Sequence, residues 1–156
     1  MKTIADIEFT QAAQLLARYG LMLRHVADGE EIPGSYWGET EAGIIGSDVF
    51  VRSDTPVHSM MHEAGHLIVL PAEKRALVHT DATDSIEEEN AVCLLQVLLG
   101  ETLDGVTRED IFDDMDAWGY SFRLGSTKAY FEDDADDAWE WLRERRLVKA
   151  ASRDLV

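Results

Sequence analysis

The sequence has little cysteine, proline or positive charge. Its single cysteine, Cys93, allows no disulfide within the chain, and this usage predicts a protein of the reducing cytoplasm. There are 14 Lys and Arg against 31 Asp and Glu, so the formal net charge is -17 at pH 7. A surface this negative repels phosphate backbones and anionic lipids. We therefore expect neither a nucleic acid nor a membrane surface as a direct partner.

Long apolar runs are also missing. The longest ones, 67–70 and 91–95, fall far short of the roughly 20 residues that a membrane span needs. Acids at positions 6 and 8 precede any apolar stretch, so we expect no signal peptide. The rest is ordinary for a globular protein: 156 residues, 46% hydrophobic and 29% charged. These values predict one soluble domain, 1-156, built around one core.

The first third of the chain changes its hydrophobic period once. Apolar residues recur at helical spacing from about Ile7 to Ala27, which predicts a helix that ends at Asp28-Gly29. Between Ile32 and Asp54 the pattern becomes short β-like pieces broken by glycine, which predicts a small hairpin or three-stranded sheet.

The remainder reads mainly as helices. Thr55, as N-cap, and Pro56, as first helical residue, open a helix that ends near Leu70, before Pro71. The later expectations are a helix from Asp84 or Ser85 to about Gly100, a helix with a capping box from Thr107 to about Ala117, a strand over Gly119 to Leu124 and a last helix over Asp133 to Val148. This order predicts an α+β domain whose helices pack on one small antiparallel sheet.

The segment His62-Glu63-Ala64-Gly65-His66 is the part of the sequence that carries chemistry. His62 and His66 are four residues apart in a predicted helix, so both rings project from one face and can bind one metal ion. Glu63 lies one residue beyond His62 and is rotated to flank the metal, where it can take a proton from water. Two histidines and one carboxylate leave a coordination position open, as hydrolytic zinc requires.

A third ligand is expected from the acidic start of the next predicted helix. Glu88 lies on the apolar face that includes Ala91 and Leu95, which makes it the first candidate. Glu87 lies slightly farther from the centre of that face and is the second candidate, whereas Glu89 is expected to point to solvent. Ser85 and Glu88 also have the spacing of a capping box, which would use Glu88 at the backbone.

These residues resemble a known family. HEAGHLI, followed by Glu88-x-x-Ala91-x-x-Leu94-Leu95-x-x-Leu98-Leu99, is similar to the ImmA/IrrE-type metallopeptidases, which are small gluzincin-like zincins. The resemblance covers about residues 44–100. It implies a minimal zincin-like metallopeptidase domain with zinc ligands at His62, His66 and Glu88 and a catalytic base at Glu63. It also implies that a substrate peptide lies along the sheet edge formed by Val49 to Arg52.

Other polar residues are candidates for assisting roles. Hydrolysis by a zinc peptidase needs a donor for the developing oxyanion, and Tyr120, Arg123 and His79 are the candidates. His58 lies four residues before His62, on the same helical face, where it would orient the site or contact a substrate. A helix-surface histidine without a role is the simpler interpretation of His58.

Two functions follow from these patterns. The first is a zinc-dependent peptidase that hydrolyses a peptide or protein substrate through a metal-activated water, with Glu63 as general base. The alternative is a non-catalytic acidic regulator with a zincin fold, which docks on a basic partner. Histidine and carboxylate ligation suits Zn²⁺, although manganese, iron or nickel would also bind such a set.

Overall fold

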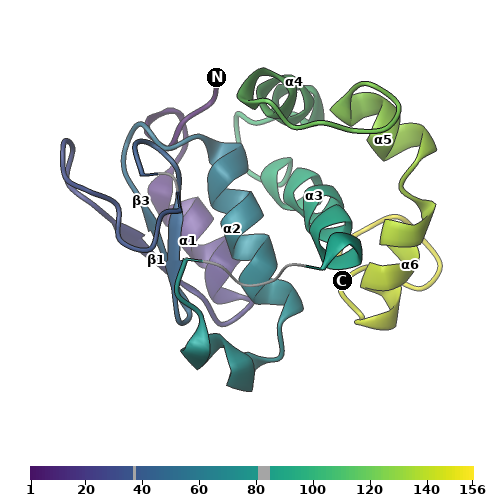
Figure 1. The fold of residues 1–156 in the computed structure, drawn as a ribbon, viewed down its shortest axis with the longest axis horizontal. Helices are drawn as coiled ribbons and strands as arrows, with labels where there is room; N and C mark the ends of the chain where they lie inside the picture. The colour runs from purple at the N-terminus through teal and green to yellow at the C-terminus, as the bar shows by residue number, and fades with distance from the viewer. Residues whose placement is uncertain (37, 81–84) are drawn as a thin grey trace.

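The computed structural model describes residues 1–36, 38–80 and 85–156 (Figure 1). Its helices and strands are, in order, α1 (Phe9–Ala17), β1 (Met22–His25), β2 (Gly43–Ile45), β3 (Asp48–Val51), α2 (Val57–Val69), α3 (Ile86–Gly100), α4 (Arg108–Trp118), α5 (Thr127–Asp133) and α6 (Asp136–Glu144), with 3-10 turns η1 (Ile4–Asp6) and η2 (Ala72–Leu77). The expected α+β class is confirmed. The possible helix start at Asp84 lies outside the described residues; α3 begins after Ser85, whose hydroxyl accepts the Glu88 N–H.

Helix α2 lies at the centre of the molecule. In Figure 1 it runs between α1 with the sheet on one side and α3 on the other, while α4 and α6 cover the far sides of α3. Its apolar residues are almost completely shielded from solvent. The largest fully buried side chains of α2 and α3 are Met60, Met61, Leu67, Leu94, Leu95 and Leu99. The segment predicted to carry chemistry is therefore held rigidly inside the core.

The sheet is mixed, so the prediction of an antiparallel sheet is wrong for one strand pair. Its order is β1-β3-β2, with β2 antiparallel and β1 parallel to β3. Strand β1 falls in a segment predicted as helix. Gly20, at φ +79, ends the helix early, and the next residues alternate between buried Leu21 and Leu23 and exposed Met22 and Arg24. That alternation is the period of a strand.

The central position of β3 overturns the expectation that a substrate peptide lies along Val49 to Arg52. Both edges of β3 are already paired, one with β1 and the other with β2. The outer edge of β2 is also occupied by the chain itself. Ile44 N–H donates to the Gly34 carbonyl, and the Ile44 carbonyl accepts the Thr80 N–H. A peptide therefore finds no free strand edge at β3.

Helix ends explain the remaining differences. The predicted helix over 56–70 is confirmed as α2, but Thr55 does not cap it, because its hydroxyl accepts the Arg52 N–H. The capping box at Thr107 is confirmed. Residues 119–124 form no strand, since Gly119 ends α4 at φ 107 and the chain turns. The last predicted helix, over Asp133 to Val148, is confirmed as the shorter α6, and α5 precedes it.

None of the helices within the described residues combines the length and the apolar content that crossing a membrane demands.

Helices α2 and α3 are in close contact at Gly65. A Cβ atom added there would lie 3.0 Å from Val92 Cγ1, closer than ordinary van der Waals contact. Glycine inside a helix costs about 1 kcal/mol relative to alanine. The close approach of α3 is the physical reason for a glycine at this position.

We expect Gly65→Ala to lower the free energy of unfolding although alanine is the better helix former. Val92 is fully buried, so the new methyl group displaces it. Removing the Val92 methyl group that opposes the new side chain should relieve the strain. Val92→Ala should therefore lower the free energy of unfolding by about 1 kcal/mol less in the Gly65→Ala background than in the parent. Urea denaturation of the four proteins measures this coupling. Gly100→Ala is the matched control, because Gly100 lies against Ile111. If the losses of stability caused by Gly65→Ala and Val92→Ala simply add in the double variant, the prediction is contradicted.

Candidate metal centre

Helix α2 brings His62 and His66 together on its side toward α3. The two rings are nearly perpendicular, and their Nε2 atoms lie 3.2 Å apart. Both side chains are buried, with 9% and 7% of the residue surface exposed. Because the residues are one helical turn apart, the same helix face presents both nitrogens to one small space.

The carboxylate that joins them belongs to Glu89. Its Oε1 lies 2.8 Å from His62 Nε2, and its Oε2 lies 3.0 Å from His66 Nε2. One ligand atom from each of these three residues falls within 4.8 Å of the others, so the group could hold a metal ion. The expectation that Glu89 points to solvent is therefore wrong.

The two acids preferred from the sequence lie elsewhere. Glu88 Oε2 is 3.8 Å from Nδ1 of His66, the ring nitrogen directed away from Glu89. Glu87 accepts a hydrogen bond from the Ser85 hydroxyl and lines a different cavity. The structure thus does not bring Glu88 or Glu87 to the shared Nε2 space.

The apolar face of α3 predicts the wrong carboxylate ligand, Glu88, because α3 is apolar on almost every side. Every residue from Ala91 to Gly100 is buried, since α2, α4 and α6 all pack on this helix. The side toward α2 is marked by Val92, which touches Gly65, and by Gln96, which contacts His62. Glu89 precedes them by three and seven residues and therefore shares their face.

Gln96 is a site residue that the sequence reasoning missed. Its Oε1 lies 2.6 Å from His62 Nδ1, and its Nε2 donates to the His58 carbonyl at 3.2 Å. It is fully buried. The available signal was its polarity inside the aliphatic run from Val92 to Leu99, because a buried amide requires hydrogen-bond partners.

Glu63 lies beside the histidines but outside the group of three. Burial raises the pKa of its carboxyl to about 7, although the positive charges of His62 and His66 oppose the shift. Burial lowers the pKa of His66, but the nearby carboxylates of Glu88 and Glu89 outweigh burial and raise that pKa above the ordinary value. The pKa of Glu89 lies well below its ordinary value, because its hydrogen bonds to both rings outweigh the opposing effect of burial.

Of the candidates for an oxyanion donor, only Tyr120 lies at the histidines. Its ring packs edge-on against His62, with centroids 5.6 Å apart, and its hydroxyl accepts from Gln96 Nε2 at 3.4 Å. That places the hydroxyl on the Nδ1 side of His62, away from Glu89. Arg123 pairs with Asp134 on the surface, and His79 hydrogen-bonds Thr80. None of these placements supplies a donor on the Nε2 side.

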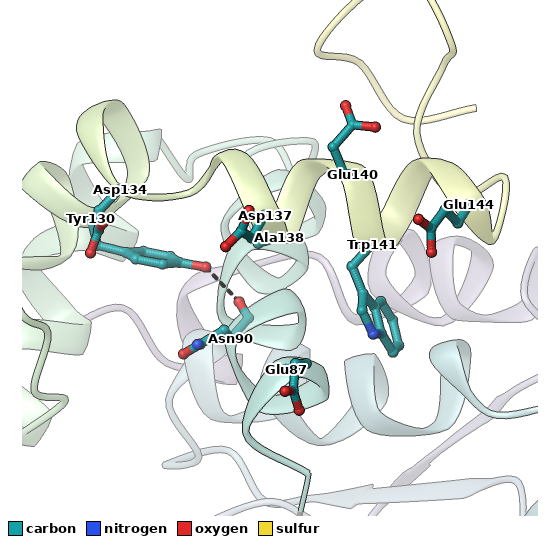
Figure 2. A pocket seen from close by; sticks show the side chains of 9 residues that line it. All are labelled: Glu87, Asn90, Tyr130, Asp134, Asp137, Ala138, Glu140, Trp141 and Glu144. Atoms are coloured by element: carbon teal, nitrogen blue, oxygen red, sulfur yellow. Dashed lines mark hydrogen bonds between the residues drawn. The ribbon is translucent and has the colours of Figure 1, made fainter.

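A cavity lies on the side of α3 opposite the histidine pair (Figure 2). Its volume is about 460 Å³, and it lies between the first turn of α3 and helices α5 and α6. Figure 2 shows the Tyr130 hydroxyl directed at the Asn90 carbonyl and the indole of Trp141 forming a wall. Its lining residues are Glu87, Asn90, Tyr130, Asp134, Asp137, Ala138, Glu140, Trp141 and Glu144. It is acidic and aromatic, and it is separate from the histidine pair.

The group of three fits zinc in both chemistry and spacing. Imidazole nitrogen and carboxylate oxygen are ordinary zinc ligands at about 2.0–2.2 Å, so two ligand atoms of a tetrahedral site lie about 3.3 Å apart. The separations of 2.8 to 3.2 Å among Nε2 and carboxylate atoms approach that value. The Glu89 side chain is 45% exposed, which leaves one side of the group open to solvent.

His58 is buried on the same helix, without a hydrogen bond to either ring nitrogen, and it packs edge-on against Trp118 and Tyr120. It is therefore not the surface histidine that the sequence suggested. Burial, and then the charge of His62, lower its pKa to about 3.

This buried histidine predicts a loss of stability in acid. Between pH 6.5 and about 3 the unfolded chain holds a proton on residue 58 that the folded chain does not, so folding weakens as the pH falls. We expect the parent to lose about 1.4 kcal/mol per pH unit below 6.5 relative to His58→Phe, measured by urea denaturation. His79→Phe, on the surface, is the control and should leave the slope unchanged. Equal slopes for the parent and His58→Phe would contradict the prediction.

Comparison of the chain with protein-family models, with curated proteins and with solved structures finds no match.

Proposed function

We propose that this chain is a zinc-dependent peptidase whose metal ligands are His62, His66 and Glu89. The observation that supports the proposal is the convergence of both Nε2 atoms and the Glu89 carboxylate, with Glu63 half-buried beside them. Zinc, when bound, lowers the pKa of water toward about 7 and polarises a peptide carbonyl. The proposal keeps the histidine pair implied by the resemblance to ImmA/IrrE-type peptidases and exchanges Glu88 for Glu89 as the acidic ligand.

Glu63 acts as the general base. Catalytic carboxylates are effective when their pKa approaches the working pH, and burial gives Glu63 a pKa of about 7. Its carboxylate takes the proton from the attacking water and then delivers it to the nitrogen of the leaving amine. One residue thus serves both proton transfers of peptide hydrolysis.

The first prediction tests the ligand set. Purified parent protein should bind about one zinc ion per chain, whereas His62→Ala and Glu89→Gln should bind none, measured by elemental analysis and isothermal titration. Glu87→Gln is the matched control, because Glu87 lies on the same helical turn and lines the other cavity. Zinc at about 100 times its Kd should stabilise the parent by about 2.7 kcal/mol. Full zinc binding by Glu89→Gln would refute the assigned ligand. The same titrations with manganese, iron and nickel identify the preferred metal.

The second prediction separates binding from catalysis. Glu63→Gln should retain zinc and lose roughly 100- to 10,000-fold in the rate of peptide hydrolysis, because the amide cannot take the proton. The rate is measured on a fluorogenic peptide library with the zinc-loaded protein. Unchanged hydrolysis by this variant would disprove the role of Glu63.

An acidic docking protein is the second candidate function. The net charge of -17 and the cavity walled by Trp141 and five carboxylates favour a cationic partner. This function predicts that a zinc-loaded chain hydrolyses no peptide and that its association with a basic partner weakens steeply as salt is added. Hydrolysis that Glu63→Gln abolishes would decide for the peptidase.

A further inference from the structure

The hydrogen bonds of Gln96 determine which nitrogen of His62 carries the ring proton. The His58 carbonyl can only accept, so the Gln96 atom that contacts it must be the donating amide nitrogen. The other end of the amide is then the oxygen, which can only accept. It lies 2.6 Å from His62 Nδ1, so Nδ1 must donate. In a neutral ring, the lone pair of His62 is then on Nε2.

Glu88 lies near the corresponding nitrogen of His66, but without a hydrogen bond. His66 Nδ1 and Glu88 Oε2 are both buried without a hydrogen-bond partner, and they lie 3.8 Å apart. A closing of about 1 Å would produce a charge-assisted hydrogen bond and satisfy both atoms. In that hydrogen bond the carboxylate can only accept, so Nδ1 of His66 would carry the proton.

From these contacts we infer that Gln96 and Glu88 are positioning residues, which hold His62 and His66 in the Nδ1–H form and direct both Nε2 lone pairs at one cation. The inference rests on the proposed metal site and gives Glu88 a role different from that of Glu89. With both rings in this form, the two Nε2 atoms and the two Glu89 oxygens are all acceptors. One divalent cation satisfies all the acceptors of such a group. Outer hydrogen bonds of this kind typically change metal affinity 10- to 100-fold.

Zinc affinity, measured by competition with a chromophoric chelator, distinguishes the roles of the acids. Glu88→Ala and Gln96→Leu should still bind zinc, but roughly 10- to 100-fold more weakly than the parent. Glu88→Gln should recover most of the affinity, because its amide oxygen still accepts from Nδ1. Glu87→Ala, one residue away, is the matched control and should bind as the parent does. Equal affinity for all these proteins, or complete loss of zinc in both Glu88 variants, would overturn the inference.

Nitrogen NMR of the histidine rings supplies a readout that a packing defect would not move. The parent should show the proton of His62 on Nδ1 in both the zinc-loaded and the chelator-treated protein, and Gln96→Leu should weaken that hydrogen-bonded proton signal. A neutral His62 ring with its proton on Nε2 would overturn the inference. Failure of the parent to bind zinc while His62 keeps its Nδ1 proton would overturn the proposed peptidase and leave the role of Gln96 standing.

Discussion

The contact between Gly65 of α2 and Val92 of α3 is the constraint on which the candidate site depends. A side chain at residue 65 would separate the two helices, because its Cβ would already lie 3.0 Å from Val92. With the helices this close, a residue one turn before Val92 and a residue one turn after it both reach the ring of His62. Those residues are Glu89 and Gln96, which contact opposite nitrogens of the ring. Helix packing, and not a dedicated loop, therefore assembles the polar centre inside the core.

The polar groups at this centre are strongly unbalanced toward acceptors. Glu89 contacts both Nε2 atoms, and Glu88 lies near the remaining nitrogen of His66. Protons on the rings or one divalent cation can compensate the negative charge of these carboxylates. Protons and the cation therefore compete for the site. The raised pKa of His66 has the same cause, since the carboxylates of Glu88 and Glu89 favour the charged ring. A buried, preformed arrangement of this kind binds a metal without a large cost in ordering its ligands.

Sequence reasoning succeeded where a local rule determines the structure. The spacing of His62 and His66 on one helix, and the capping box at Thr107, depend on helix geometry alone. It failed where packing partners decide. The helical spacing of apolar residues over 7–27 predicts one helix, whereas Gly20 allows the turn that separates α1 from β1. Glu88 was preferred over Glu89 because the apolar residues of α3 were assumed to define one buried face, whereas three helices cover α3. In a helix that is apolar all round, the buried polar residue is the better guide, and Gln96 marks the side on which Glu89 lies.

The arrangement of the sheet limits how a peptide can reach the site. Zincin-like peptidases are expected to bind substrate as an added strand, yet β3 is central and the outer edge of β2 is held by Gly34 and Thr80. Among the site residues, Glu89 is the one whose side chain is substantially exposed, at 45%. In the proposed peptidase, the exposed side of Glu89 is therefore where a substrate carbonyl would approach the histidine pair. In the proposed site, the first turn of α3 then contributes a metal ligand at Glu89 and a positioning group at Glu88, while Glu87 lines the acidic cavity. Three consecutive carboxylates serve three different surroundings because successive helix positions are rotated by about 100°.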